Sequence, residues 1–268
     1  MLYVVTRSLA GETYVLRTQH INSVVMSLPG RRTLGLARRL LTRDYHAVAN
    51  YFGRSAYKLP DLRSLPDFSP LARRIVAEGR SSLYYDRLFT LFASVRETSR
   101  RFEGPLTMAE VGVWKGGTSR FLLECVQGSR LLGFDTFEGH DARDIQDKND
   151  GEHAARSFAD TSYASVQGYL AGFDVTLYKG RFAETCHAAD GELFHFVHLD
   201  VDIYQPMKHA LEFFSTRVAK GGVIVVDDYG FATCPGVIKA VNEFKDSAIN
   251  FDFAANMLTG QCRLVRLY

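Results

Sequence analysis

Two acidic pairs constrain the fold of this chain more than any other feature of its sequence. The first pair, Asp200 and Asp202, and the second pair, Asp227 and Asp228, each follow a short run rich in apolar and β-branched residues. Such runs are typical of strands that are buried on both faces of a parallel sheet. The two pairs are therefore expected at the ends of two buried strands.

The segment between the two apolar runs predicts a helix. Its apolar side chains recur at helical spacing, and Gly221-Gly222 is expected to end the helix before the second strand. The acidic pairs then share the carboxyl edge of an open α/β sheet, which is where ligands bind in such sheets. Four carboxylates at one edge repel one another unless a cation lies among them. A hard divalent ion with oxygen ligands is the simplest occupant.

A glycine-rich turn earlier in the chain predicts a ligand site at the same edge. Gly112 lies in this turn, and Thr118 and Ser119 begin the helix that follows it. Glu110 stands where a dinucleotide site has glycine, and a carboxylate there suits a ligand with an amino or sulfonium group. Asp135 ends the next predicted strand, about 25 residues after Glu110, where a carboxylate can accept both hydroxyls of a ribose.

Each of these patterns also has a simpler structural explanation. The glycine turn could be an unrelated βα turn, and Asp227-Asp228 could cap a helix beside a solvated neighbour. Two acidic pairs at adjacent strand ends favour metal ligation over that alternative. His198 is interpreted as buried, or as supporting a ligand, rather than as a ligand itself. The polar segment 140–157 is expected to be a loop, either a lid over the site or a plain surface insertion. Of the loop histidines His140, His153 and His187, one could help as a base, but a surface role is favoured.

Composition places the chain among ordinary globular enzymes. Of the 268 residues, 46% are hydrophobic and 23% are charged, which fits one α/β domain with an appendage. No apolar run approaches the roughly 20 residues of a membrane span, and the first ten residues do not form a secretory signal. The four cysteines are far apart in the sequence and form no zinc-type pairs. A cytoplasmic enzyme without a membrane partner is expected.

Charge is distributed unevenly along the chain. Residues 1–101 hold 17 Lys and Arg against 7 Asp and Glu, whereas the remainder holds 15 against 23. This asymmetry favours solvated or oligomer-facing helices over a nucleic-acid surface, because the basic residues come as scattered doublets. We therefore expect a mainly helical extension over 1–101, serving as a lid or a subunit contact, with a helix at 33–51. The α/β domain is expected over 102–268, with a closing antiparallel strand pair at 250–267.

Five motifs resemble the macrocin O-methyltransferase family, which methylates sugar hydroxyls of macrolides and related natural products. They are EVGVWKGGTS, FDTFEG, KGRFAET, HLDVDIYQP and GGVIVVDDYGFATCPGVIKAVNEF, and they cover about residues 84–244. The resemblance implies a class I methyltransferase fold, in which helices flank a mostly parallel, Rossmann-like sheet of seven strands. It also implies S-adenosylmethionine as cofactor and a divalent metal ion, most simply Mg²⁺.

The resemblance further implies roles for individual residues. Asp200, Asp227 and Asp228 would be metal ligands, and Asp202 would be the general base. Asp202 is expected just past the strand end, where the chain turns, in a position to take a proton. The residues expected around the cofactor are Glu110, Gly112, Thr118, Ser119, Asp135, Phe137, Gly180, Phe182 and Asp200.

The predicted function is a metal-dependent O-methyltransferase that modifies a small molecule with vicinal hydroxyls, most simply the sugar of an antibiotic or other secondary metabolite. A homo-oligomer is expected. Three alternatives remain open: a catechol-type phenol methyltransferase, a non-catalytic scaffold that binds S-adenosylmethionine, and a nucleic-acid methyltransferase that uses the basic N-terminal third.

Overall fold

A computed structural model describes residues 3–7, 13–17, 62–146, 148–151, 153–256 and 259–268. The chain divides into two compact units, Met1–Pro60 and Asp61–Tyr268. In the first unit, β1 (Tyr3–Arg7) pairs with β2 (Thr13–Arg17) as an antiparallel hairpin. The helix expected at 33–51 lies outside the described residues.

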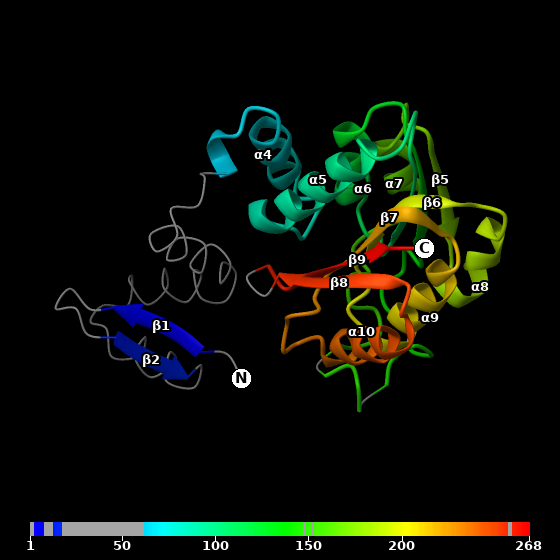
Figure 1. The fold of residues 1–268 in the computed structure, drawn as a ribbon. Helices are drawn as coiled ribbons and strands as arrows, with labels where there is room; N and C mark the ends of the chain where they lie inside the picture. The colour runs from blue at the N-terminus through cyan, green and yellow to red at the C-terminus, as the bar shows by residue number, and fades with distance from the viewer. Residues whose placement is uncertain (1–2, 8–12, 18–61, 147, 152, 257–258) are drawn as a thin grey trace. The chain divides into compact units, whose positions relative to one another are not determined.

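The second unit is built on a seven-stranded sheet with the order β5-β4-β3-β6-β7-β9-β8 (Figure 1). Its first five strands are parallel, and β9 runs antiparallel to both β7 and β8. The predicted closing antiparallel pair is thereby confirmed. The strands are β3 (Thr107–Val111), β4 (Arg130–Asp135), β5 (Val175–Lys179), β6 (Phe194–Leu199), β7 (Val218–Val226), β8 (Phe251–Asn256) and β9 (Gln261–Arg266).

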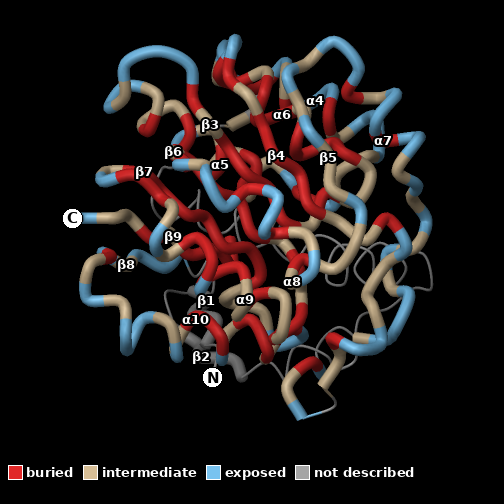
Figure 2. Tube along the Cα trace, turned by 90° about the vertical axis from the view of Figure 1, so that its right-hand side faces the viewer, coloured by how far each residue is buried: buried red, intermediate tan, exposed pale blue. Residues whose placement is uncertain are grey.

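Helices cover both faces of this sheet, because successive side chains of each central strand point to opposite faces. On one face, Met108 and Phe196 pack with side chains of the first helices; on the other, Ala109 and Val197 pack with those of the later helices. Figure 2 shows the resulting band of buried residues through the central strands. The helices are α4 (Ser69–Glu78), α5 (Tyr85–Ser99), α6 (Gly117–Cys125), α7 (Tyr163–Tyr169), α8 (Phe182–Thr185), α9 (Tyr204–Ser215) and α10 (Pro235–Ser247), with 3₁₀ turns η1 (Leu62–Ser64) and η2 (Cys186–Ala189).

The position of Gly221-Gly222 differs from the prediction. Helix α9 already ends at Ser215, and the glycine pair lies inside β7, where the pairing with β6 shifts register. A Cβ on Gly222 would lie 2.8 Å from the carbonyl oxygen of Ala219. The expectation that this pair ends the helix is wrong, because the glycines instead permit a bulge in the strand.

Residues 62–101 of the expected N-terminal extension belong to the same compact unit as the sheet. Helix α5 contacts α6, β6 and β7, and α4 contacts α5 and α6. This packing brings the first turn of α5 to the carboxyl edge of the sheet. Within the described part of the chain, no helix combines the length and the apolar character that crossing a membrane requires.

Candidate active site

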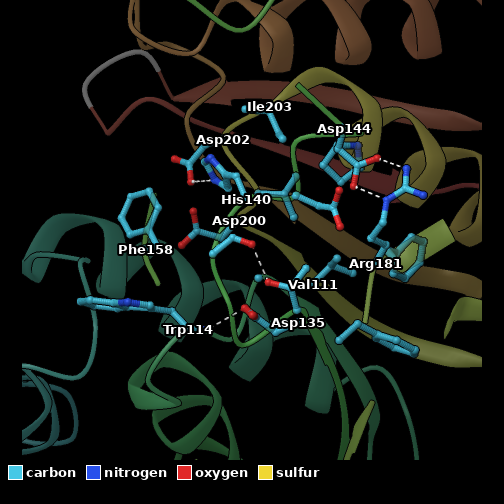
Figure 3. Close-up of a pocket in the computed structure, with 18 of the residues that line it drawn as sticks. Val111, Trp114, Asp135, His140, Asp144, Phe158, Arg181, Asp200, Asp202 and Ile203 are labelled. Atoms are coloured by element: carbon cyan, nitrogen blue, oxygen red, sulfur yellow. Dashed lines mark hydrogen bonds and ion pairs between the residues drawn. The ribbon is translucent and has the colours of Figure 1, made fainter. Parts of the chain in front are cut away.

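A pocket lies at the carboxyl ends of the parallel strands, where the sequence predicted a ligand site (Figure 3). Seven of the predicted site residues line it: Gly112, Asp135, Gly180, Phe182, Asp200, Asp202 and Asp228. Five others are not among its lining residues: Glu110, Thr118, Ser119, Phe137 and Asp227. Three of the four strand-end carboxylates thus share one cavity with Asp135.

The four strand-end aspartates influence one another electrostatically; Asp227 and Asp228 are buried, and Asp200 and Asp202 are half-buried. Burial and the neighbouring carboxylates raise the pKa of Asp200 to about 8, and burial raises that of Asp227 to about 7. The pKa of Asp228 is raised well above its ordinary value for the same reasons. The raised pKa values reflect the repulsion among the carboxylates that the sequence predicted. When no other cation is bound, protonation of the carboxylates reduces this repulsion.

Arg87, in the first turn of α5, supplies one positive charge to these aspartates. Its Nη2 lies 2.5 Å from Oδ2 of Asp227, and its Nη1 lies 3.5 Å from Oδ1 of Asp228. Burial opposes the charge of the guanidinium, but the carboxylates outweigh it and raise the pKa of Arg87. No motif in the sequence singles out this residue; its only signal is an arginine beside Leu88 in a segment expected to be mainly helical.

His140 contacts Asp202, the predicted general base. Its Nε2 lies 3.3 Å from Oδ2 of Asp202 (Figure 3). Its ring centroid lies 5.5 Å from that of His153. Burial raises the pKa of Asp202, but the hydrogen bond and charge of His140, a hydrogen bond with Asp228 and the charge of His153 together outweigh this effect and lower it. The interpretation of His140 as a surface residue is wrong, because the loop that carries it folds back over the strand ends.

Buried hydrogen bonds and an ion pair hold the loop 140–157 in place. The carboxylate of Asp150 accepts the backbone N–H of Tyr204, at the start of α9, and that of Gln146, each at 2.6 Å. Arg181 donates from Nε to Asp144 at 2.9 Å and forms a second, shorter bond to the same carboxylate. These contacts attach the loop to two strand ends of the sheet.

Backbone conformation explains how Asp202 reaches the pocket. Strand β6 ends at Leu199, and Asp202 and Asp228 have φ values of 60° and 61°. Positive φ is uncommon for residues other than glycine, and where it persists at a site the surrounding structure enforces it. Asp202 lies where the chain turns after the strand, which is the position expected from the sequence.

The glycine-rich turn is held tightly against the rest of the site. Asp135 accepts the backbone N–H of Trp114 at 2.8 Å and that of Phe137 at 2.5 Å. Burial raises the pKa of Asp135 despite these bonds. A Cβ on Gly112 would lie 1.7 Å from the carbonyl oxygen of Asp200, at a φ of 92°, so no other residue fits there without a backbone shift.

Glu110 lies beneath the turn instead of lining the pocket. Its side chain is fully buried; one oxygen lies 2.8 Å from Nδ1 of His198, and the other accepts a hydrogen bond from Ser119. Thr118 shares a hydrogen bond of 2.9 Å with Ser81. The predicted roles of Glu110, Thr118 and Ser119 in cofactor binding stay predictions, and their side chains are engaged with one another and with neighbours.

The architecture is that of the class I methyltransferases. The structure of the O-methyltransferase NovP matches 70% of this chain and 83% of its own chain, with a TM-score of 0.58 and 21% identity. The structure of the O-methyltransferase TomG from Streptomyces achromogenes matches 83% of this chain and 96% of its own chain, with a TM-score of 0.51 and 17% identity. These similarities confirm the predicted fold class.

A family model described as macrocin-O-methyltransferase (TylF) matches residues 85–255, and the chain belongs to that family. The resemblance inferred from the sequence motifs is therefore confirmed. A tetracenomycin 4′-O-methyltransferase from Streptomyces olivaceus, which acts on a rhamnosyl derivative by its name, is 26% identical over 148 residues. A demethyldecarbamoylnovobiocin O-methyltransferase from Streptomyces niveus is 24% identical over 176 residues. The alignments span 48% and 58% of this chain, and 55% and 63% of the respective relatives.

Proposed function

We propose that this protein is an S-adenosylmethionine-dependent O-methyltransferase that methylates a hydroxyl on the sugar of a natural product with the help of a divalent metal ion. Family membership and the class I fold support the methyl transfer, and one relative is named for a rhamnosyl acceptor. The observation that carries the proposal is a single pocket that contains Asp135 together with Asp200, Asp202 and Asp228.

The donor set fits a divalent ion. The site holds four carboxylates and one guanidinium, that of Arg87. The raised pKa values of Asp200 and Asp227 indicate that this single positive charge does not balance the negative charge of the carboxylates. Asp200, Asp227 and Asp228 would hold the ion through oxygen atoms, which hard cations prefer. Such an ion, when bound, orients vicinal hydroxyls and lowers their pKa.

Asp202 and Asp135 would have separate tasks in methyl transfer. The pKa of Asp202 is lowered, so its carboxylate is ionised near neutral pH and can accept the proton of the acceptor hydroxyl. His140 holds one of its oxygens and thereby orients the carboxylate. Asp135, fixed by two backbone N–H groups, can accept ribose hydroxyls with its remaining lone pairs. The cofactor supplies an electrophilic methyl group on a sulfonium.

A methylation assay with a graded acceptor panel tests the proposal. Glycosylated aromatic and macrolide compounds with a free vicinal diol are incubated with S-adenosylmethionine, and products are scored by mass for one added methyl group. We expect methylation of diol-bearing compounds only, and loss of turnover after chelation that added divalent ion restores. Asp202→Asn should lower kcat roughly 100-fold or more, whereas the exposed Asp246→Asn should not change it. Failure to bind S-adenosylmethionine in calorimetry would exclude the proposal.

A further inference from the structure

His198 carries a ring nitrogen that the proposed mechanism leaves unused. The residue lies on β6, two positions before Asp200, and its side chain is fully buried. Its Nδ1 is 2.8 Å from Oε1 of Glu110. Its Nε2 is buried and has no hydrogen-bond partner among the residues that the structure describes. A buried polar atom without a partner calls for an explanation, because it loses the hydrogen bonds that water would make.

A buried chain of polar groups sets the tautomer of this histidine. Ser119 donates to one oxygen of Glu110, and the other oxygen faces Nδ1 of His198. A carboxylate only accepts when it is ionised, so the proton of a neutral His198 lies on Nδ1 and the lone pair lies on Nε2. Histidines that bind metals show this arrangement: one ring nitrogen donates to a carboxylate and the other ligates the ion.

The imidazole of His198 lies beside two of the strand-end aspartates. One potential ligand atom each from His198, Asp200 and Asp227 lie within 4.8 Å of one another. His198 is the second-last residue of β6, and Asp200 directly follows the end of that strand. Asp227, at the end of the neighbouring strand β7, is fully buried like His198.

We propose that Nε2 of His198 is a ligand of the metal ion, so that the ion is a first-row transition metal such as Mn²⁺, Fe²⁺ or Co²⁺ rather than Mg²⁺. This inference rests on the metal ion of the proposed function and revises the Mg²⁺ expected from the sequence. Imidazole adds affinity for transition metals, whereas Mg²⁺ favours sites made of oxygen atoms and retains several of its waters. Glu110 then acts as a positioning residue for the ligand.

A neighbouring group of residues must be distinguished from this one. His140, His153 and Asp202 also place ligand atoms within 4.8 Å of one another. An ion at that group would be bound by imidazole as well, but not by His198. The experiment therefore needs to identify which histidine is bound, and His140 provides the matched control.

Mn²⁺ serves as the probe, because its electron spin reports directly on bound nitrogen. The metal-free full chain is titrated with Mn²⁺, and binding is followed by the loss of the free-ion signal in electron paramagnetic resonance. Electron spin-echo modulation then detects a coordinated imidazole nitrogen, and ¹⁵N-labelled histidine confirms its source. We expect the nitrogen coupling in the unmodified protein, in the absence of any acceptor or turnover.

Three variants identify the histidine that supplies the coordinated nitrogen. His198→Gln should lose the coupling and bind Mn²⁺ at least about 10-fold more weakly, with a smaller preference for Mn²⁺ over Mg²⁺. His140→Gln should retain the coupling. Glu110→Gln should retain it as well, but with affinity reduced about 10-fold, because the ligand loses the carboxylate that orients it. Circular dichroism checks that each variant is folded, and the unmodified protein carries the test if His198→Gln is not.

The outcomes separate this inference from the proposed function. Bound Mn²⁺ without nitrogen coupling, or coupling that disappears in His140→Gln and persists in His198→Gln, overturns the role of His198 alone. Absence of Mn²⁺ binding overturns this inference together with the metal ion of the proposed function. Methyl transfer itself is tested separately by the acceptor assay.

Discussion

For single residues, the neighbours of each carboxylate determine the chemistry of the site. Asp200 and Asp202 are two positions apart, yet the pKa of Asp200 is raised and that of Asp202 is lowered. Asp200 lies among other carboxylates, whereas Asp202 accepts a hydrogen bond from His140. The same side-chain type thus carries a proton in one position and is ready to take one in the other.

The raised pKa of Asp200 predicts how the stability of the metal-free protein depends on pH. An aspartate that holds its proton to about pH 8 when folded, but releases it near pH 4 when unfolded, stabilises the fold at low pH. This contribution decreases as the pH rises from about 4 towards 8. We expect the chelated protein to have a lower Tm at pH 8 than at pH 6.

The variant Asp200→Asn provides the control for this prediction. Asparagine stays neutral at both values of pH, so the difference in Tm between pH 6 and pH 8 should shrink. Thermal unfolding followed by circular dichroism in a chelating buffer measures both proteins. An unchanged difference in Asp200→Asn would assign the pH dependence to other groups.

At the scale of elements, the loop 140–157 brings His140 to the strand ends. Its fixed point is Asp150, which is almost fully buried and accepts backbone N–H groups from both α9 and the loop itself. The sequence shows a polar, acidic segment, and its composition is equally compatible with a solvated insertion. The hydrogen bond between Asp150 and Tyr204 shows that the segment is anchored to the start of α9. Composition does not predict this bond, because it links residues far apart in the chain.

Replacement of Asp150 by alanine should release this loop. Two buried N–H groups would lose their acceptor, at a cost of about 1–3 kcal/mol for each that stays unpaired. We expect faster proteolysis and faster amide exchange within 140–157, with little change in the strands. Asp141→Ala is the matched control, because its carboxylate bonds to Arg143 of the same loop. Equal protection of the loop in Asp150→Ala and the native protein would contradict this account.

At the scale of the whole molecule, Arg87 ties a helix that precedes the sheet to the end of one of its central strands. It is separated by 140 residues from Asp227, its partner at 2.5 Å. The match of the family model begins at residue 85 and therefore includes this arginine. The helical segment 62–101 is thus part of the site as well as part of the core.

Arg87→Gln should destabilise the metal-free protein by about 3 kcal/mol, because Asp227 and Asp228 lose their buried counter-charge. Added divalent ion should restore more stability to this variant than to the native protein. Denaturant unfolding with and without chelator measures both effects. Arg96→Gln, on the same helix but away from the aspartates, should behave like the native protein; equal stability of both variants would argue against the ion pair.

The sequence alone determined the strand and turn pattern of the sheet, and it identified the residues at the ends of the strands. Apolar runs, glycine turns and acidic pairs are local signals, so Asp135, Asp200, Asp202 and Asp228 could be placed at one edge without coordinates. Only the tertiary structure decided which other side chains lie at that edge. Arg87 and His140 reach it through packing and loop closure between distant segments, and no local pattern records such contacts. The contact of His198 with Glu110, 88 residues away, is likewise set by strand pairing rather than by any local pattern.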